Sequence, residues 1–162
     1  MARLEPLVLR RARAEDAPAF CAILYDTFES TWKPELTPEA VKAFLREDRP
    51  SAYVSTRGQL FWVAEGDGEI AGFVDWDGDF VNALHVLARH ARTGIGARLM
   101  DLAEADIANA GFAAARLETD TFNLRSQAFY RARGYVEARR YPDLEWNSGL
   151  TTLLLQKALT GH

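Results

Sequence analysis

The stretch that decides the fold reads Leu84-His85-Val86-Leu87-Ala88-Arg89-His90-Ala91-Arg92-Thr93-Gly94-Ile95-Gly96-Ala97. A strand-like apolar run ends in a basic turn with two glycines, and this turn leads directly into an amphipathic helix. Such a junction directs several backbone N–H groups and a helix N-terminus toward one point, which favours phosphate binding. Gly94 and Gly96 let the backbone approach an anion closely, and Arg92 adds a fixed positive charge. The turn therefore predicts a phosphorylated ligand.

Two common phosphate-binding motifs do not fit this turn. The dinucleotide-binding motif G-x-G-x-x-G requires a third glycine where this chain has Leu99. The phosphate loop of nucleoside triphosphatases requires Lys followed by Ser or Thr, where this chain has Ala97 and Arg98. A plain glycine-containing connection between a strand and a helix stays open as an alternative.

A second motif further along the chain reads Asn123-Leu124-Arg125-Ser126-Gln127-Ala128-Phe129-Tyr130-Arg131-Ala132-Arg133-Gly134-Tyr135. Together the two segments resemble the GNAT superfamily of acyl-CoA-dependent N-acetyltransferases. The first family motif, L-x-V before a basic R/Q-x-x-G-x-G/A turn, is matched by Leu84, Val86, Gly94 and Gly96. The second, N-x-x-S/A-x-x-F/L-Y-x-x-x-G-F/Y, is matched by Asn123, Ser126, Phe129, Tyr130, Gly134 and Tyr135.

The resemblance implies acetyl-CoA as the co-substrate and no metal. Ala91 stands where the family usually has Arg or Gln, so phosphate binding would depend more on backbone N–H groups and on Arg92. The residues implied to contact the cofactor are Leu84, Val86, Arg92, Thr93, Gly94, Ile95, Gly96, Ala97, Asn123 and Ser126.

The hydrophobic pattern predicts one continuous domain over residues 1–162. Strands are expected at residues 7–11, 60–64, 70–74, 80–87, 114–119, 135–140 and 150–157. Helices are expected at residues 14–30, 37–47, 94–109 and 123–133. This order is that of the family over roughly residues 7–157. It implies an α+β fold of three α/β/α layers, in which four helices flank a mixed, mostly antiparallel sheet of about seven strands.

Composition indicates a soluble cytoplasmic enzyme. The formal charge of −4 argues against nucleic-acid binding, and no apolar run is long enough to span a membrane. The charged N-terminus lacks the apolar stretch of a signal peptide. The single cysteine, Cys21, fits a reducing compartment and is expected in the core. A homodimer is an open alternative for the assembly.

Neither calcium nor zinc is expected. Asp75, Asp77 and Asp79 are spaced like calcium ligands, but the glycine and glutamate that a calcium loop requires are absent. The three histidines lack the spacing of zinc ligands. His85 is therefore expected to serve packing.

Acetyl transfer requires a neutral amine, a polarised carbonyl and a proton for the departing thiolate. The resemblance assigns the proton donor to Tyr130 and the carbonyl contact to the backbone N–H near Val86. For the base, the chain resembles ribosomal-protein and peptide N-terminal acetyltransferases, which implies Glu118, twelve residues before Tyr130. We expect Glu118 near the sheet interior, where burial would raise its pKa. Asp75 is the alternative base.

The acceptor is expected to be a primary amine. Between Gly58 and Ala88 the chain has six acidic residues and no Lys or Arg, which predicts attraction of a cationic acceptor. Phe28, Trp32 and Asp75 are the expected acceptor contacts, with Trp76, Tyr141 and Trp146 as further candidate walls. A non-catalytic acyl-CoA-binding module remains the alternative function, and Tyr130 together with Glu118 favours the enzyme.

Overall fold

The computed structural model describes residues 7–143 and 148–159. Seven strands form one sheet in the order β1-β2-β3-β4-β5-β7-β6. The strands are β1 (Val8–Arg11), β2 (Trp62–Gly66), β3 (Glu69–Asp77), β4 (Phe80–Val86), β5 (Ala114–Asp120), β6 (Val136–Pro142) and β7 (Thr151–Ala158). Only β4 and β5 pair in parallel among these strands, and the other neighbours are antiparallel. The expected mixed, mostly antiparallel sheet is confirmed.

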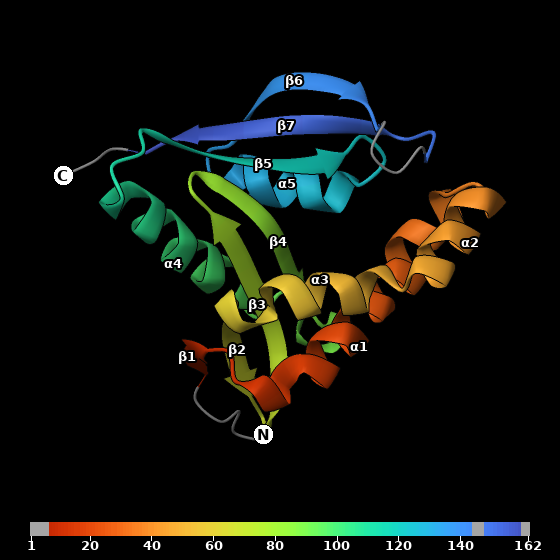
Figure 1. Cartoon of the computed structure of the whole chain (residues 1–162). Coiled ribbons are helices and arrows are strands. Elements are labelled where there is room, and N and C mark those ends of the chain that lie inside the picture. The colour runs from red at the N-terminus through yellow and green to blue at the C-terminus, as the bar shows by residue number, and fades with distance from the viewer. Residues whose placement is uncertain (1–6, 144–147, 160–162) are drawn as a thin grey trace.

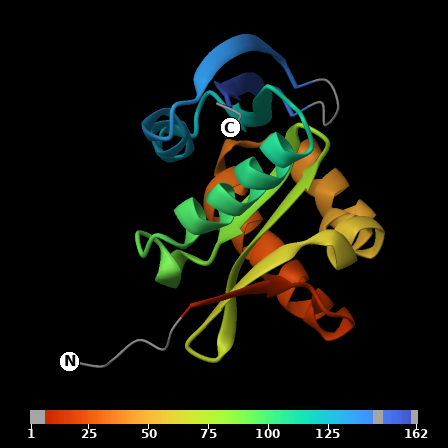
Figure 2. The same cartoon turned by 90° about the vertical axis from the view of Figure 1, so that its left-hand side faces the viewer.

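Helices cover both faces of the sheet (Figures 1 and 2). On one face, α4 (Ile95–Asn109) and α5 (Leu124–Ala132) pack on the sheet through residues such as Leu99 and Tyr130. On the other face lie α1 (Ala17–Thr27), α2 (Pro38–Glu47) and α3 (Arg49–Arg57), and α1 and α3 bury Phe20 and Val54 against the sheet. The expected α/β/α layering is confirmed.

The helical region before β2 differs from the expectation. The helix predicted at residues 14–30 is regular only over α1, and a π-helical turn, Phe28–Trp32, follows it. Helix α3 was not predicted. Its sequence contains proline and several hydroxyl residues, which have low helix propensity, yet Pro50 fits the first turn and Val54 is buried in the core. Tertiary burial therefore stabilises a helix that local propensity does not indicate.

The strands β4 and β5 part soon after they meet. Only two residue pairs join them, Phe80 with Arg116 and Val81 with Leu117. In the pairing with β3, Asn82 is an extra residue, because Trp76 opposes Val81 while Asp75 opposes Ala83. Such a bulge bends a strand and increases its twist. Residues 82–86 of β4 thus run away from β5, as Figure 1 shows, and leave an edge of the strand open inside the sheet.

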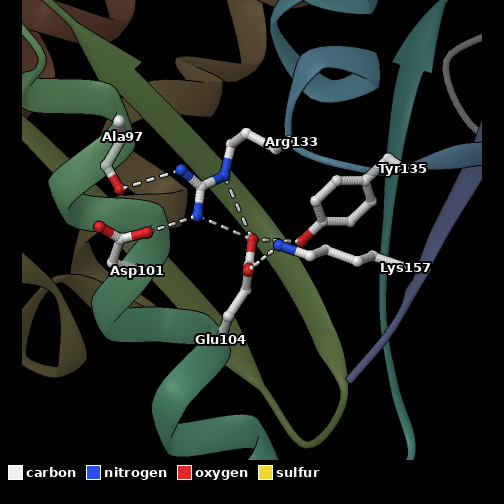
Figure 3. Close-up of polar contacts among 6 residues, drawn as sticks. All are labelled: Ala97, Asp101, Glu104, Arg133, Tyr135 and Lys157. Carbon is white, nitrogen blue, oxygen red and sulfur yellow. Dashed lines mark hydrogen bonds and ion pairs between the residues drawn. The ribbon is translucent and has the colours of Figure 1, made fainter. Parts of the chain in front are cut away.

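A buried carboxylate joins α4 to the chain that follows α5 (Figure 3). The Glu104 carboxylate accepts hydrogen bonds from Arg133 Nη2 (3.1 Å), Tyr135 Oη (3.0 Å) and Lys157 Nζ (2.6 Å). Arg133 also donates to the carbonyl oxygen of Ala97 (3.3 Å) and to Asp101 (2.7 Å). This network fixes the distance between the start of α4 and the end of α5.

Candidate active site

The glycine turn leads from β4 to the N-terminus of α4. Gly94 is the N-cap residue at φ 85°, and Arg92 has φ 63°. Arg92, Thr93 and Gly94 are exposed. The N–H groups of Ile95, Gly96 and Ala97 belong to the first turn of the helix, where no intrahelical acceptor exists. The turn thus offers N–H donors, the positive end of the helix dipole and one arginine to an anion.

The preceding basic residues have a different role from Arg92. Arg89 donates to Glu69 through Nε (2.8 Å) and Nη2, and His90 Nε2 lies 2.7 Å from the same carboxylate. The hydrogen bonds from Arg89, and then from His90, lower the pKa of Glu69 to about 2. These contacts attach the turn to the start of β3.

The two glycines of the turn are not equivalent. A Cβ atom at Gly96 would lie 3.4 Å from the Phe129 ring, so this glycine serves the packing of α4 against α5. A Cβ atom at Gly94 would meet no protein atom within 4 Å, although its φ of 85° favours glycine. The space beside Gly94 is therefore open to a ligand.

The open edge of β4 directs backbone donors into the gap between β4 and β5. The Leu87 N–H bonds to Ala71 O (2.8 Å) on the β3 side. Because successive residues of a strand point their N–H groups to opposite sides, the N–H groups of Val86 and Leu84 point away from β3. Both residues lie past the point where the pairing with β5 ends. An extended ligand with amide groups can pair with this edge.

The second motif borders the same gap from β5 and α5. Tyr130 is buried, and burial raises the pKa of its hydroxyl above the ordinary value. Its hydroxyl has no hydrogen bond in the described part of the chain, where every fully buried side-chain polar atom has a partner. The hydroxyl is therefore not completely enclosed by the protein. Asn123 caps α5 by accepting from Ser126 N (3.1 Å), and Ser126 Oγ lies 2.9 Å from Thr119 Oγ1.

A pocket of about 180 Å³ lies on the opposite face of β4, between this strand and helices α1, α2 and α3. Its lining residues are Leu24, Thr27, Phe28, Trp32, Phe44, Arg49, Pro50, Tyr53, Asn82, Ala83 and His85. Phe28 and Trp32, both expected from the sequence as acceptor contacts, are among them. Phe28 stacks on Phe44 with 3.7 Å between the ring centroids.

The prediction for Asp75 needs correction. Asp75 is fully buried behind the pocket, where it accepts hydrogen bonds from Tyr53 Oη (2.5 Å), Arg57 Nε (2.7 Å) and Nη2 (3.0 Å), and Asn82 Nδ2 (3.1 Å). Three of these donors converge on Oδ2 and the fourth reaches Oδ1, and the side chain is fully enclosed and absent from the pocket lining, so Asp75 does not contact an acceptor in the pocket. Burial and the bond to Asp75 raise the pKa of Tyr53. Asp75 instead positions two residues of the pocket wall.

Glu118 lies at the point where β4 and β5 part, one residue past the last pair. The expected burial is wrong, because its side chain is exposed. It alternates with buried Leu117, which packs on the α4 face, so it points to the face that carries the pocket. Asp120 points to the same face, and there burial, together with the charges of Asp143 and Glu118, raises the pKa of Asp120 to about 6.

The acidic surface expected from the sequence is largely neutralised. Arginines outside residues 58–88, two of them directly flanking this segment, pair with five of the acidic residues. The pairs are Glu65–Arg10, Glu69–Arg89, Asp75–Arg57, Asp77–Arg57 and Asp79–Arg116. Counting charges along residues 58–88 could not reveal these partners.

Three further residues were predicted as walls of the acceptor site. Trp76 is not a pocket wall, because its Nε1 donates to Asp106 on α4 (2.7 Å), on the other face. Tyr141 lies on β6, away from the pocket lining, and Trp146 lies outside the described residues. Sequence reasoning did not place Tyr53 or Asn82 in the acceptor site, and for His85 it favoured packing. The alternation of His85 with Leu84 and Val86 was the one available signal, whereas Tyr53 belongs to the unpredicted helix.

Within residues 7–143 and 148–159, no group of three or more His, Cys, Asp or Glu side chains is arranged so that it could hold a metal ion. In the same residues, no helix is long and apolar enough to cross a bilayer.

Comparisons with known proteins agree with this geometry. The model of the acetyltransferase (GNAT) family matches residues 17–135. An uncharacterized N-acetyltransferase from the pepI 3′ region of Lactobacillus delbrueckii subsp. lactis is 26% identical over 161 residues, covering 90% of this chain and 93% of that protein.

Two solved structures share the fold. A GCN5-related N-acetyltransferase from Rhodopseudomonas palustris is 22% identical with a TM-score of 0.78, over 98% of this chain and 99% of that one. The PaiA N-acetyltransferase from Thermoplasma acidophilum, solved in complex with coenzyme A, is 16% identical with a TM-score of 0.75, over 95% and 99% of the two chains.

Proposed function

Because this chain belongs to the acetyltransferase (GNAT) family, we propose that it transfers an acetyl group from acetyl-CoA to a primary amine by direct attack in a ternary complex. The observation that carries the proposal is the parting of β4 and β5 beside the glycine turn. In this proposal the open strand edge, the N-terminus of α4 as the anion site and the buried Tyr130 border one gap. A pocket for a second substrate lies across the same strand.

In this proposal acetyl-CoA follows the gap. Its pyrophosphate binds the turn from Arg92 to Ala97, where the N–H groups of Thr93, Ile95 and Gly96 and the guanidinium of Arg92 supply donors. Its pantetheine arm pairs with the β4 edge at Leu84 and Val86. Asn123 and Ser126 border the arm from α5, and the Asn123 side-chain amide still has free donors beside its capping bond.

The reaction forms one C–N bond and breaks one C–S bond. The neutral amine attacks the thioester carbonyl carbon, and negative charge develops on the carbonyl oxygen. The Val86 N–H, which points into the gap, supports stabilisation of this oxyanion. As the C–S bond breaks, Tyr130 donates its proton to the leaving sulfur of coenzyme A. The raised pKa of Tyr130 supports this role, because the hydroxyl keeps its proton until the sulfur takes it.

The amine must lose a proton before or during attack. We retain Glu118 for this step because it lies at the apex of the gap, on the face of the pocket. Asp120 is the alternative, since its pKa near 6 suits proton acceptance near neutral pH. In Glu118→Gln, the rising limb of kcat/KM with pH should be lost or shifted. An unchanged profile would transfer the role to Asp120 or water.

The test is the release of coenzyme A from acetyl-CoA with a panel of primary amines, combined with calorimetry of acetyl-CoA binding. Amine-dependent release is the expected result. Binding of acetyl-CoA without release by any amine would favour the non-catalytic module. Absence of acetyl-CoA binding would overturn both.

A further inference from the structure

On the premise of acetyl transfer, we propose that the acceptor is a primary amine carrying one apolar, aromatic-sized group and no second cationic group. This class differs from the generally cationic acceptor that the acidic residues of the sequence suggest. It follows from the walls of the pocket, from the pairing of the charges around it, and from the position of its free polar atoms.

The helical side of the pocket is aromatic. Phe28 and Phe44 stack almost parallel, at 5° between ring planes, and Trp32 and Tyr53 add two more rings to the lining. Leu24 and Pro50 also contribute apolar surface. A flat apolar group gains both burial and ring contacts in such surroundings.

The charged groups in the pocket lining and directly behind it are already paired, and the carboxylates of Glu118 and Asp120 lie on β5, outside this lining. Among the described residues, none of those that line the pocket carries a carboxylate. Its arginine, Arg49, donates to Glu47 (2.7 Å), and the nearby Asp75 is neutralised by Arg57 (2.7 Å). A second ammonium group on the acceptor would enter without a counter-ion, and burying an unpaired charge is costly. Diamines and polyamines should therefore be poor acceptors.

Two acceptor atoms lie on the opposite wall, formed by β4. Asn82 uses its Nδ2 to reach Asp75, which leaves its carbonyl oxygen unused. His85 also lines the pocket and has no hydrogen bond among the described residues, and since no fully buried side-chain nitrogen there lacks a partner, its ring nitrogens are not completely enclosed. Burial lowers the pKa of His85 to about 4, so the ring is neutral and retains a lone pair.

The pocket therefore has an orientation. Amine N–H groups fit the Asn82 oxygen and the neutral His85 on β4, next to the edge assigned to the thioester. The apolar group then extends toward the rings of the turn Phe28–Trp32, α2 and α3. A free amine and the N-terminus of a peptide that begins with an aromatic residue share this chemistry.

The experiment compares 2-phenylethylamine, 1,4-diaminobutane and the peptide Phe-Ala-Ala, by coenzyme A release and by calorimetry with each amine alone. We expect kcat/KM to be at least tenfold higher for phenylethylamine or the peptide than for the diamine. The ratio between the first two identifies a free amine or a peptide as the source. Equal or better use of the diamine would overturn this inference while leaving acetyl transfer intact. Failure of both aromatic probes to bind or react would overturn it too.

A variant of a lining residue tests whether the aromatic acceptor binds in this pocket. Ala83→Leu adds bulk to the β4 wall, so it should raise KM for phenylethylamine at least tenfold and leave acetyl-CoA affinity unchanged. Ala158→Leu makes the same substitution at an exposed site on β7 and should change neither. An unchanged KM in a folded Ala83→Leu protein would contradict the proposed site. If the wild-type protein did not bind acetyl-CoA, the proposed function itself would be rejected.

Discussion

Two buried carboxylates lie on opposite sides of the sheet. Each accepts hydrogen bonds from several side chains, but the parts of the molecule that they connect differ. Glu104 accepts hydrogen bonds from Arg133, Tyr135 and Lys157 (Figure 3). This network joins α4 to the end of α5 and to β7, behind the proposed cofactor site. Asp75 accepts hydrogen bonds from Arg57, Tyr53 and Asn82, and Tyr53 and Asn82 line the pocket. The difference indicates that each substrate has its own supporting network, so the two sites should be separable by mutation.

The largest effect is expected at Tyr130, on the Glu104 side. Tyr130→Phe keeps the ring and removes the proton, so turnover should fall roughly 10²–10⁴-fold. Affinities for acetyl-CoA and for the amine should barely move, because neither network is touched. Steady-state kinetics with calorimetry checks this. Normal turnover in the variant would show that the cofactor side contributes binding and no chemistry.

The two carboxylates themselves provide the sharpest test of the comparison. Asp75→Asn leaves Arg57 with only the more distant Asp77 (3.7 Å), and Glu104→Gln removes the carboxylate that pairs with Lys157, so each should lower the free energy of unfolding by about 3 kcal/mol in urea titrations. Only Asp75→Asn should raise KM for the amine, because the new amide group repels the Asn82 and Arg57 donors. If Glu104→Gln raised this KM equally, the two networks would not be separate.

A smaller effect is expected at the glycine turn. Gly94→Ala puts a methyl group into the space beside the N-terminus of α4 and should weaken acetyl-CoA binding about tenfold, or about 1.4 kcal/mol. Gly111→Ala is the matched control, because this glycine also has a positive φ and no protein atom near its Cβ position, at the other end of α4. Equal affinities in the two variants would show that phosphate does not approach Gly94.

The smallest effect concerns Asp120. Its pKa is raised to about 6, so the folded protein binds this proton more tightly than the unfolded chain does. The resulting stability is present at low pH and is lost as pH rises through about 6. The free energy of unfolding of Asp120→Asn, relative to that of the wild type, should therefore rise by about 1 kcal/mol from about pH 4 to about pH 7, allowing for the partial exposure of the side chain. Urea unfolding at both pH values measures it, and a constant difference would contradict the raised pKa.

The cofactor side could largely be predicted from the sequence because its determinants are local. The glycine turn, the helix after it and the Asn123 cap are contiguous stretches whose backbone geometry depends on near neighbours. The parallel pairing of β4 with β5 followed from the crossover helix between them. The role of Gly96 is the exception, since its packing partner, Phe129, comes from another helix.

The acceptor side was decided by the tertiary structure. Its pocket combines α1, the turn after it, α2, α3 and β4, and α3 carries no local helical signal. The bulge at Asn82 depends on the register with β3, and the neutralisation of Asp75 depends on Arg57, eighteen residues earlier in the chain. The sequence by itself indicated the fold, through the order of its elements and its two family motifs, and it indicated the glycine turn proposed for the cofactor, because the backbone preferences of such a turn act over a few residues. The size, polarity and charge of the proposed acceptor pocket result from contacts between distant side chains, which only the folded chain brings together.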